Sequence, residues 1–137
     1  MNTINDFIKE AQGYLFQLDD VSSALTEAIQ DCTTWTQNVR VAQDNYDKLE
    51  AAFIFDLVTG SSLAATGKNA EQRSAAKDAE LMKFRDDTQE WKVLQDTKEM
   101  LAEYQSSVRQ NEKKLGAIKV QAKSVSSIIK ALSGQAV

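Results

Sequence analysis

The chain has 137 residues, of which 42% are hydrophobic and 26% are charged, a composition typical of one folded domain rather than of a disordered segment. It contains no histidine, which excludes the commonest general base, the commonest zinc ligand and every nucleophile that histidine activates. The formal net charge is −4. We therefore expect a protein that is not an enzyme and that needs no cofactor and no metal.

Helix-breaking residues are nearly absent, since the chain has no proline and only five glycines. No apolar run approaches the roughly 20 residues that are needed to cross a membrane. The first residues also lack the basic segment of a secretory signal. These features predict an all-α protein, one domain over residues 1–137, located in the cytoplasm and without a membrane partner.

The first predicted helix covers about residues 4–18. Apolar residues from Ile4 to Leu18 recur at spacings of three and four, which is the pattern of one apolar helical face. Asp19 or Asp20 can cap a following helix. The pattern leaves open whether the chain breaks or only bends there.

A second helix is predicted over about residues 20–58. From Val21 to Phe53 the spacings of three and four alternate as in a heptad seam. Residues 59–68, with Gly60 and Gly67, form the one predicted loop. Asn69 is a suitable N-cap for the helix that follows.

The third helix is predicted over about residues 69–132, with Gly116 as the only candidate for a kink. Folded against the second helix, it gives a long antiparallel hairpin whose longer arm lacks an internal partner. We expect copies of the chain to cover this overhang in a homo-oligomeric helical bundle, with Asn111 fixing the register. The predicted oligomer interface consists of Leu101, Val108, Leu115, Ile118, Val125, Ile129 and Leu132.

Basic residues gather near the end of the chain. Residues 104–137 contain six basic residues and one acid, Glu112, so this segment has a net charge of +5 and the remainder −9. At about 100° per residue, five of the six fall within an arc of roughly 120° beside the apolar seam. The five are Arg109, Lys113, Lys119, Lys123 and Lys130.

Such a row can follow the phosphates of single-stranded DNA without reading the base sequence, and association of several copies would multiply the binding through avidity. The same pattern is also typical of a solvated helix face whose lysines pair with acids on a neighbouring helix. A basic and apolar helix can also lie on an anionic bilayer.

A second basic group, Lys68, Arg73 and Lys77, surrounds the start of the third helix and could bind a phosphate.

The layout of a helical arm, a glycine-containing loop and a long final helix with basic residues resembles the UvsY-like recombination mediators of phages. The string from Thr66 to Asn69, followed by Arg73, is similar to a pattern in small helical proteins of tailed phages. The resemblance implies an oligomer that binds single-stranded DNA and helps a recombinase to displace a single-strand-binding protein. Members of that family carry basic residues just before the loop, whereas Leu49–Asp56 is acidic and apolar here.

The leading hypothesis is therefore a non-enzymatic recombination mediator that is encoded by a phage and acts in the cytoplasm of its host cell. The alternative is a structural or protein-interaction coiled coil, such as a virion or assembly component or an inhibitor of host defence, which binds no nucleic acid. A small helical subunit of an RNA-guided complex is a third possibility.

Overall fold

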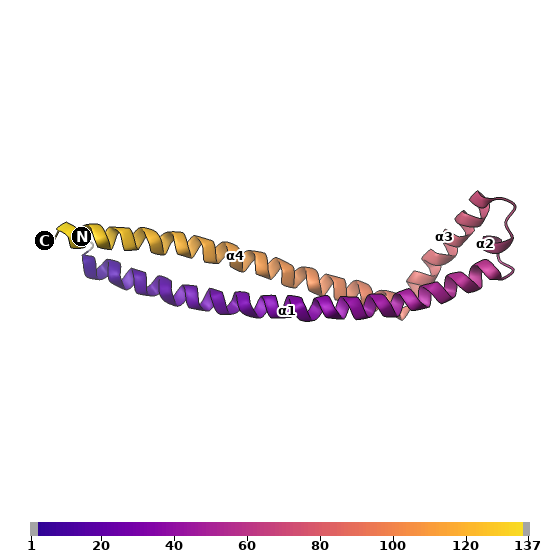
Figure 1. The fold of residues 1–137 in the computed structure, drawn as a ribbon, viewed down its shortest axis with the longest axis horizontal. Helices are drawn as coiled ribbons and strands as arrows, with labels where there is room; N and C mark the ends of the chain where they lie inside the picture. The colour runs from indigo at the N-terminus through magenta and orange to yellow at the C-terminus, as the bar shows by residue number, and fades with distance from the viewer. Residues whose placement is uncertain (1–2, 136–137) are drawn as a thin grey trace. The chain divides into compact units, whose positions relative to one another are not determined.

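The computed structural model describes residues 3–135, and every regular element in that range is an α-helix. The elements are α1 (Ile4–Thr59), α2 (Leu63–Thr66), α3 (Ala70–Asp87) and α4 (Gln89–Gln135). The start of α1 lies beside the end of α4, so the two long helices are antiparallel (Figure 1). The predicted all-α helical hairpin is confirmed.

The described residues divide into two compact units, and both α1 and α4 contribute to each of them. In the terminal unit, residues 4–32 of α1 pack with residues 103–135 of α4. The central unit consists of residues 33–102 and contains the connection between the two long helices. The sequence alone indicated a single domain and gave no sign of this division.

Helix α1 begins with a reciprocal cap and then continues for 56 residues. The Asp6 carboxylate accepts a hydrogen bond from the Thr3 backbone N–H at 2.9 Å, and the Thr3 hydroxyl accepts one from the Asp6 N–H at 3.4 Å. No break occurs at Asp19 or Asp20, whose side chains are exposed. The spacing of three and four continues through this point, so one helix can keep a single face inward along its whole length.

The inward face of α1 follows the predicted seam. Ala28 and Ala42 are buried, and Tyr46 is only 1% exposed. The remaining predicted positions between Val21 and Phe53 are half-buried, except Leu49, which is 39% exposed. The heptad pattern therefore identified the packing face of this helix correctly.

Aromatic side chains build the core of the central unit around Tyr46 and Leu94, the two largest fully buried side chains. The Tyr46 ring centroid lies 4.8 Å from that of Trp91 and 6.2 Å from that of Phe84. Phe84 in turn stacks on Phe53 at 4.3 Å. These contacts join α1 to both α3 and α4 within this unit.

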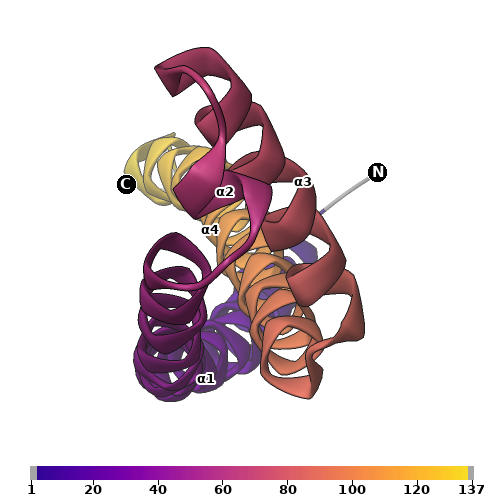
Figure 2. The ribbon, with the colours of Figure 1, turned by 90° about the vertical axis from the view of Figure 1, so that its right-hand side faces the viewer.

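The predicted third helix is divided at Thr88, and Gly116 produces no interruption. Thr88 has φ −97° and ψ 123°, an extended conformation that ends α3, and α4 begins at the next residue (Figure 2). The Thr88 hydroxyl donates to the Phe84 carbonyl, and this bond replaces one of the helix hydrogen bonds lost at the break. Threonine is tolerated within helices, so its residue type alone did not reveal the interruption.

The predicted loop over residues 59–68 contains the short helix α2, which packs on α3. Asn69 caps α3 as predicted, because its side-chain oxygen accepts the Gln72 backbone N–H at 2.8 Å. Gly67 is buried, and a Cβ there would lie 2.8 Å from the Leu63 carbonyl oxygen. This close approach explains why glycine occupies the position.

The predicted overhang of the final helix is wrong. Because α1 runs without a break from Ile4, its first half covers residues 103–135 of α4 within the terminal unit. The last part of the chain thus has an internal partner. Association of copies, if it occurs, must use faces that the hairpin leaves uncovered.

Replacement of Leu94 by alanine tests the core of the central unit. Leu94 is 0% exposed, so we expect Leu94→Ala to lower the free energy of unfolding by about 2–5 kcal/mol through lost burial and a cavity. The neighbouring Val93 is 43% exposed, and Val93→Ala should change the free energy of unfolding by only about 0.5 kcal/mol. Urea unfolding followed by circular dichroism measures both, and equal effects would contradict this description of the core.

Candidate nucleic-acid interface

The basic residues predicted near the end of the chain all lie on α4 in the terminal unit, and all of them are exposed. Lys114, which falls outside the predicted arc, is exposed as well. Their spacing on one continuous helix keeps the predicted five on neighbouring faces. The basic row consists of Arg109, Lys113, Lys119, Lys123 and Lys130.

No side chain of the basic row forms an ion pair within residues 3–135. The two ion pairs in that range join Lys83 to Glu80 and Arg85 to Glu50, both outside the terminal unit. A solvated row neutralised by acids of the neighbouring helix would instead show such pairs along α4. The positive charges of the row are therefore open to an external anion.

The two helices of the terminal unit carry opposite charge. Residues 4–32 of α1 contain six acids and one base, Lys9, and so have a net charge of −5. Residues 103–135 of α4 contain six bases against Glu103 and Glu112, a net charge of +4. A polyanion can approach the unit favourably only along α4, since α1 repels it.

The seven residues predicted to form an oligomer interface lie on the inward face of α4. Ile118 and Val125 are 9% and 5% exposed, and the other five are half-buried. Because the chain itself covers Ile118 and Val125, these two are not available to a second copy. The remaining five are Leu101, Val108, Leu115, Ile129 and Leu132.

The second basic group surrounds the start of α3 in the central unit. The guanidinium of Arg73 donates to the Gly67 carbonyl oxygen at 2.9 Å and is half-buried, so it holds the loop. The Lys68 backbone N–H donates to the Gln72 side chain at 2.8 Å, while the Lys68 side chain is exposed. Lys77 is half-buried. The structure therefore gives Arg73 an internal role and leaves only Lys68 fully open to a phosphate.

A polar network beside the central core involves Tyr46, Glu50 and Arg85. Arg85 Nε donates to the Tyr46 hydroxyl at 3.2 Å, its guanidinium lies 3.7 Å from the Glu50 carboxylate, and its Cζ lies 4.8 Å from the Trp91 ring centroid. Burial and the nearby Glu50 carboxylate raise the pKa of Tyr46 above its ordinary 10.0. The folded protein therefore binds the Tyr46 proton more tightly than the unfolded chain does. The stability that results is fully present below pH 10.0 and is lost as the pH rises through the raised pKa. The network thus joins α1 to α3 beside the core of the central unit.

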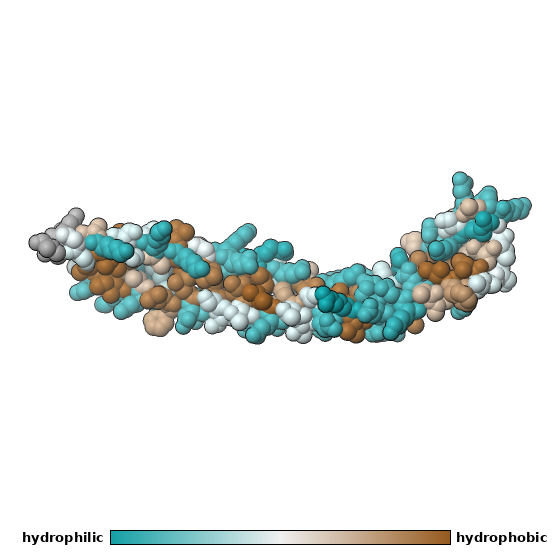
Figure 3. Space-filling view, in the orientation of Figure 1, coloured by the Kyte–Doolittle hydropathy of each residue, from teal (hydrophilic) through white to brown (hydrophobic). Residues whose placement is uncertain are grey.

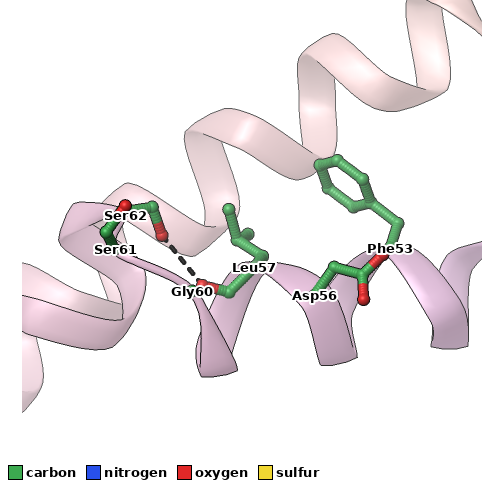
Figure 4. Close-up of a pocket in the computed structure, with 6 residues that line it drawn as sticks. All are labelled: Phe53, Asp56, Leu57, Gly60, Ser61 and Ser62. Atoms are coloured by element: carbon green, nitrogen blue, oxygen red, sulfur yellow. Dashed lines mark hydrogen bonds between the residues drawn. The ribbon is translucent and has the colours of Figure 1, made fainter.

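A pocket of about 320 Å³ opens at the end of α1 in the central unit (Figure 4). Phe53 and Leu57 provide apolar walls, and Asp56 provides a carboxylate. The Ser62 hydroxyl donates to the Leu57 carbonyl oxygen at 2.8 Å and so closes one side. No basic side chain lines this pocket, so it does not extend the basic surface of the molecule.

Exposed apolar side chains on the terminal unit were not among the predicted site residues. Phe16 is 73% exposed, Leu15 64% and Val120 66%. A shallow groove beside Phe16 and Leu15 is completed by Gln12 and Asp19. Apolar surface is visible between polar areas along both long helices in Figure 3. Phe16 and Val120 depart from the seam spacing, which is the signal that could have marked them as outward-facing. Leu15 fits the spacing of the apolar face predicted for residues 4–18, so its exposure differs from that prediction.

Substitution of Arg73 tests its internal role. Arg73→Lys keeps the positive charge but loses the guanidinium bond to Gly67, so we expect the free energy of unfolding to fall by about 1 kcal/mol. Lys77→Arg, also a charge-conserving change on α3, should keep the free energy of unfolding within about 0.5 kcal/mol of the native value. Thermal unfolding compares the two variants. If Arg73→Lys is as stable as the native chain, Arg73 does not hold the loop.

Among residues 3–135, no helix is long and apolar enough to span a bilayer, and no group of cysteine and acidic side chains is arranged to hold a metal ion. Comparison with known protein families gives no match for the chain. No curated protein and no solved structure matches it significantly. The resemblance to recombination mediators thus remains a hypothesis.

Proposed function

We propose that the protein is a non-enzymatic binder of single-stranded DNA that holds the phosphate backbone along the basic row of α4. The observation that carries the proposal is the exposure of five positive side chains, none of them in an ion pair within the part of the chain that the structure describes. Lysine and arginine on a helix face attract phosphates without distinguishing bases. Binding should therefore be independent of sequence.

The spacing of the row suits an extended strand. Arg109 and Lys113 are one helical turn apart, and so are Lys119 and Lys123, while Lys130 follows two turns later. A flexible single strand can adjust its phosphates to such intervals more easily than a rigid duplex. The exposed apolar Val120 stands beside Lys119 and could contact a base.

The acidic α1 limits the affinity of the complex. A net charge of −5 on the neighbouring helix opposes a polyanion, and screening by salt reduces the attraction of α4 further. We therefore propose binding that is strong only at low salt. A protein that must release DNA to another protein would benefit from such weak contacts.

The proposed biological role follows from the resemblance to phage recombination mediators. In that role the chain would help a recombinase to load on single-stranded DNA that a single-strand-binding protein covers. Both proteins are proposed partners. The acidic surface of α1 is the part of the terminal unit that could contact a basic partner without competing with DNA.

Binding of a fluorescent oligonucleotide across a salt series tests the proposed function. Five phosphate contacts predict a slope of log affinity against log salt of about −3.5, and Lys119→Glu with Lys123→Glu should reduce its magnitude by about 1.4. Lys92→Glu with Lys98→Glu is the matched control, because both lysines are exposed on α4 but lie in the central unit. No binding at low salt, or equal loss in both double variants, would disprove the proposal.

A second candidate function is that of a protein-interaction coiled coil, and exposed apolar side chains in the central unit favour it. Phe55 and Met82 are each 66% exposed, and Leu63 is 58% exposed. Large apolar side chains in solvent often mark a surface for a protein partner. In this case the chain would act as an assembly component or as an inhibitor, without nucleic acid.

A pull-down from host lysate with two variants tests the second candidate. A specific partner that binds the native chain should be lost with Phe55→Asp and Leu63→Asp but retained with the charge reversals at Lys119 and Lys123. The converse result, a partner lost only with the lysine reversals, would place protein binding on the basic row instead.

A further inference from the structure

The outward faces of α1 and α4 in the terminal unit carry charged columns of opposite sign and equal spacing. On α1 the acids are Asp6, Asp20 and Glu27, and on α4 the bases are Arg109, Lys123 and Lys130. All six are exposed. Each acid is separated from the corresponding base by 103 positions in the sequence. Residues seven apart stay on nearly the same helix face, with a drift of about 20°, so each set forms a column.

Each column is interrupted by a glycine at the equivalent position. Gly13 follows Asp6 by seven residues, and Gly116 follows Arg109 by seven. A Cβ added to either glycine would meet nothing within 4 Å, so packing within the chain does not require them. A glycine inside a helix costs about 0.5–1 kcal/mol relative to alanine. Close approach of another helix is a physical reason to keep both.

An exposed apolar residue lies next to each column. Phe16 stands one turn after Gly13, and Val120 stands one turn after Gly116. They are 73% and 66% exposed, the highest values among the large hydrophobic residues of the terminal unit. Phe16 and Val120 are 104 positions apart, so they match almost the same register as the charges.

We propose that a second copy of this chain docks its α4 alongside α1 of the first, in parallel, with each α1 residue beside the α4 residue 103 positions later. In this register Asp20 meets Lys123 and Glu27 meets Lys130. The two glycines allow the helix backbones to approach, and Phe16 packs against Val120. Charge and residue size are therefore complementary at an offset of 103 positions, and the apolar contact lies one position away, at 104.

A single chain cannot make these contacts itself. Within the chain α1 and α4 are antiparallel, so residues later in α1 lie beside residues earlier in α4 (Figure 1). Matching both columns in order requires parallel helices, and the inward seam already occupies the face between α1 and α4. The described residues show no ion pair between the columns, in agreement with a contact reserved for another copy.

This contact does not depend on the proposed function, although both use Lys123 and Lys130. Single-stranded DNA and a second copy would compete for these side chains. Each copy presents one acidic and one basic column, so the assembly can grow until it closes on itself. Self-association is therefore measured without nucleic acid, which separates its failure from a failure of DNA binding.

Paired charge reversals test the proposal by sedimentation velocity across a concentration series. The native chain should form an assembly larger than one copy. Asp20→Lys with Glu27→Lys, and separately Lys123→Glu with Lys130→Glu, should each weaken self-association at least about tenfold, because attractive pairs become repulsive. An equimolar mixture of the two variants should restore the native mass, since the basic α1 of one variant then faces the acidic α4 of the other.

The matched control reverses charges of the same kind outside the terminal unit, with Asp44→Lys on α1 and Lys98→Glu on α4, both of them exposed. These variants should associate like the native chain. Circular dichroism verifies that every variant remains helical. A native chain that sediments as one copy at all concentrations, or a mixture that stays dissociated, would overturn the proposal.

Discussion

One narrow apolar seam holds α1 and α4 together, and the rest of the structure depends on it. Ala28 and Tyr46 on α1 and Leu94 and Val125 on α4 are among the few buried hydrophobic residues. Two helices packed side by side can bury only one face of each, so the outer faces remain in solvent whatever their composition. Opposite charges on the outer faces of the terminal unit are therefore exposed and available to ligands.

The sequence predicted the fold well wherever apolar spacing determines it. The alternation of three and four from Val21 onward identified the buried face of α1, and Asn69 identified the start of α3. It could not decide between a break and a continuous helix at Asp19, because aspartate suits both a cap and a solvated helix face. The break at Thr88 lies between Phe84 and Trp91, which both pack against the distant Tyr46, and local spacing contains no information about such contacts.

The candidate site was predicted in part, for a related reason. Lys119 and the other members of the basic row were singled out by their residue type and spacing, and the structure shows that they are exposed. The assignment of Ile118 and Val125 to an interface between copies assumed an overhang that the structure lacks. Phe16 was overlooked because a single apolar residue outside the seam has no periodic signal, and it gains meaning only beside the charges of its own face.

The order of the helices along the chain has a consequence for how the hairpin forms. Tyr46 and Arg85 are 39 positions apart in the sequence, whereas the first turns of α1 lie beside the end of α4, more than one hundred positions later. Closing a longer link costs more chain entropy. The pairing of α1 with α4 should therefore begin in the central unit and then extend toward the ends of the chain. The same hierarchy makes the outer ends the first region to open under thermal motion.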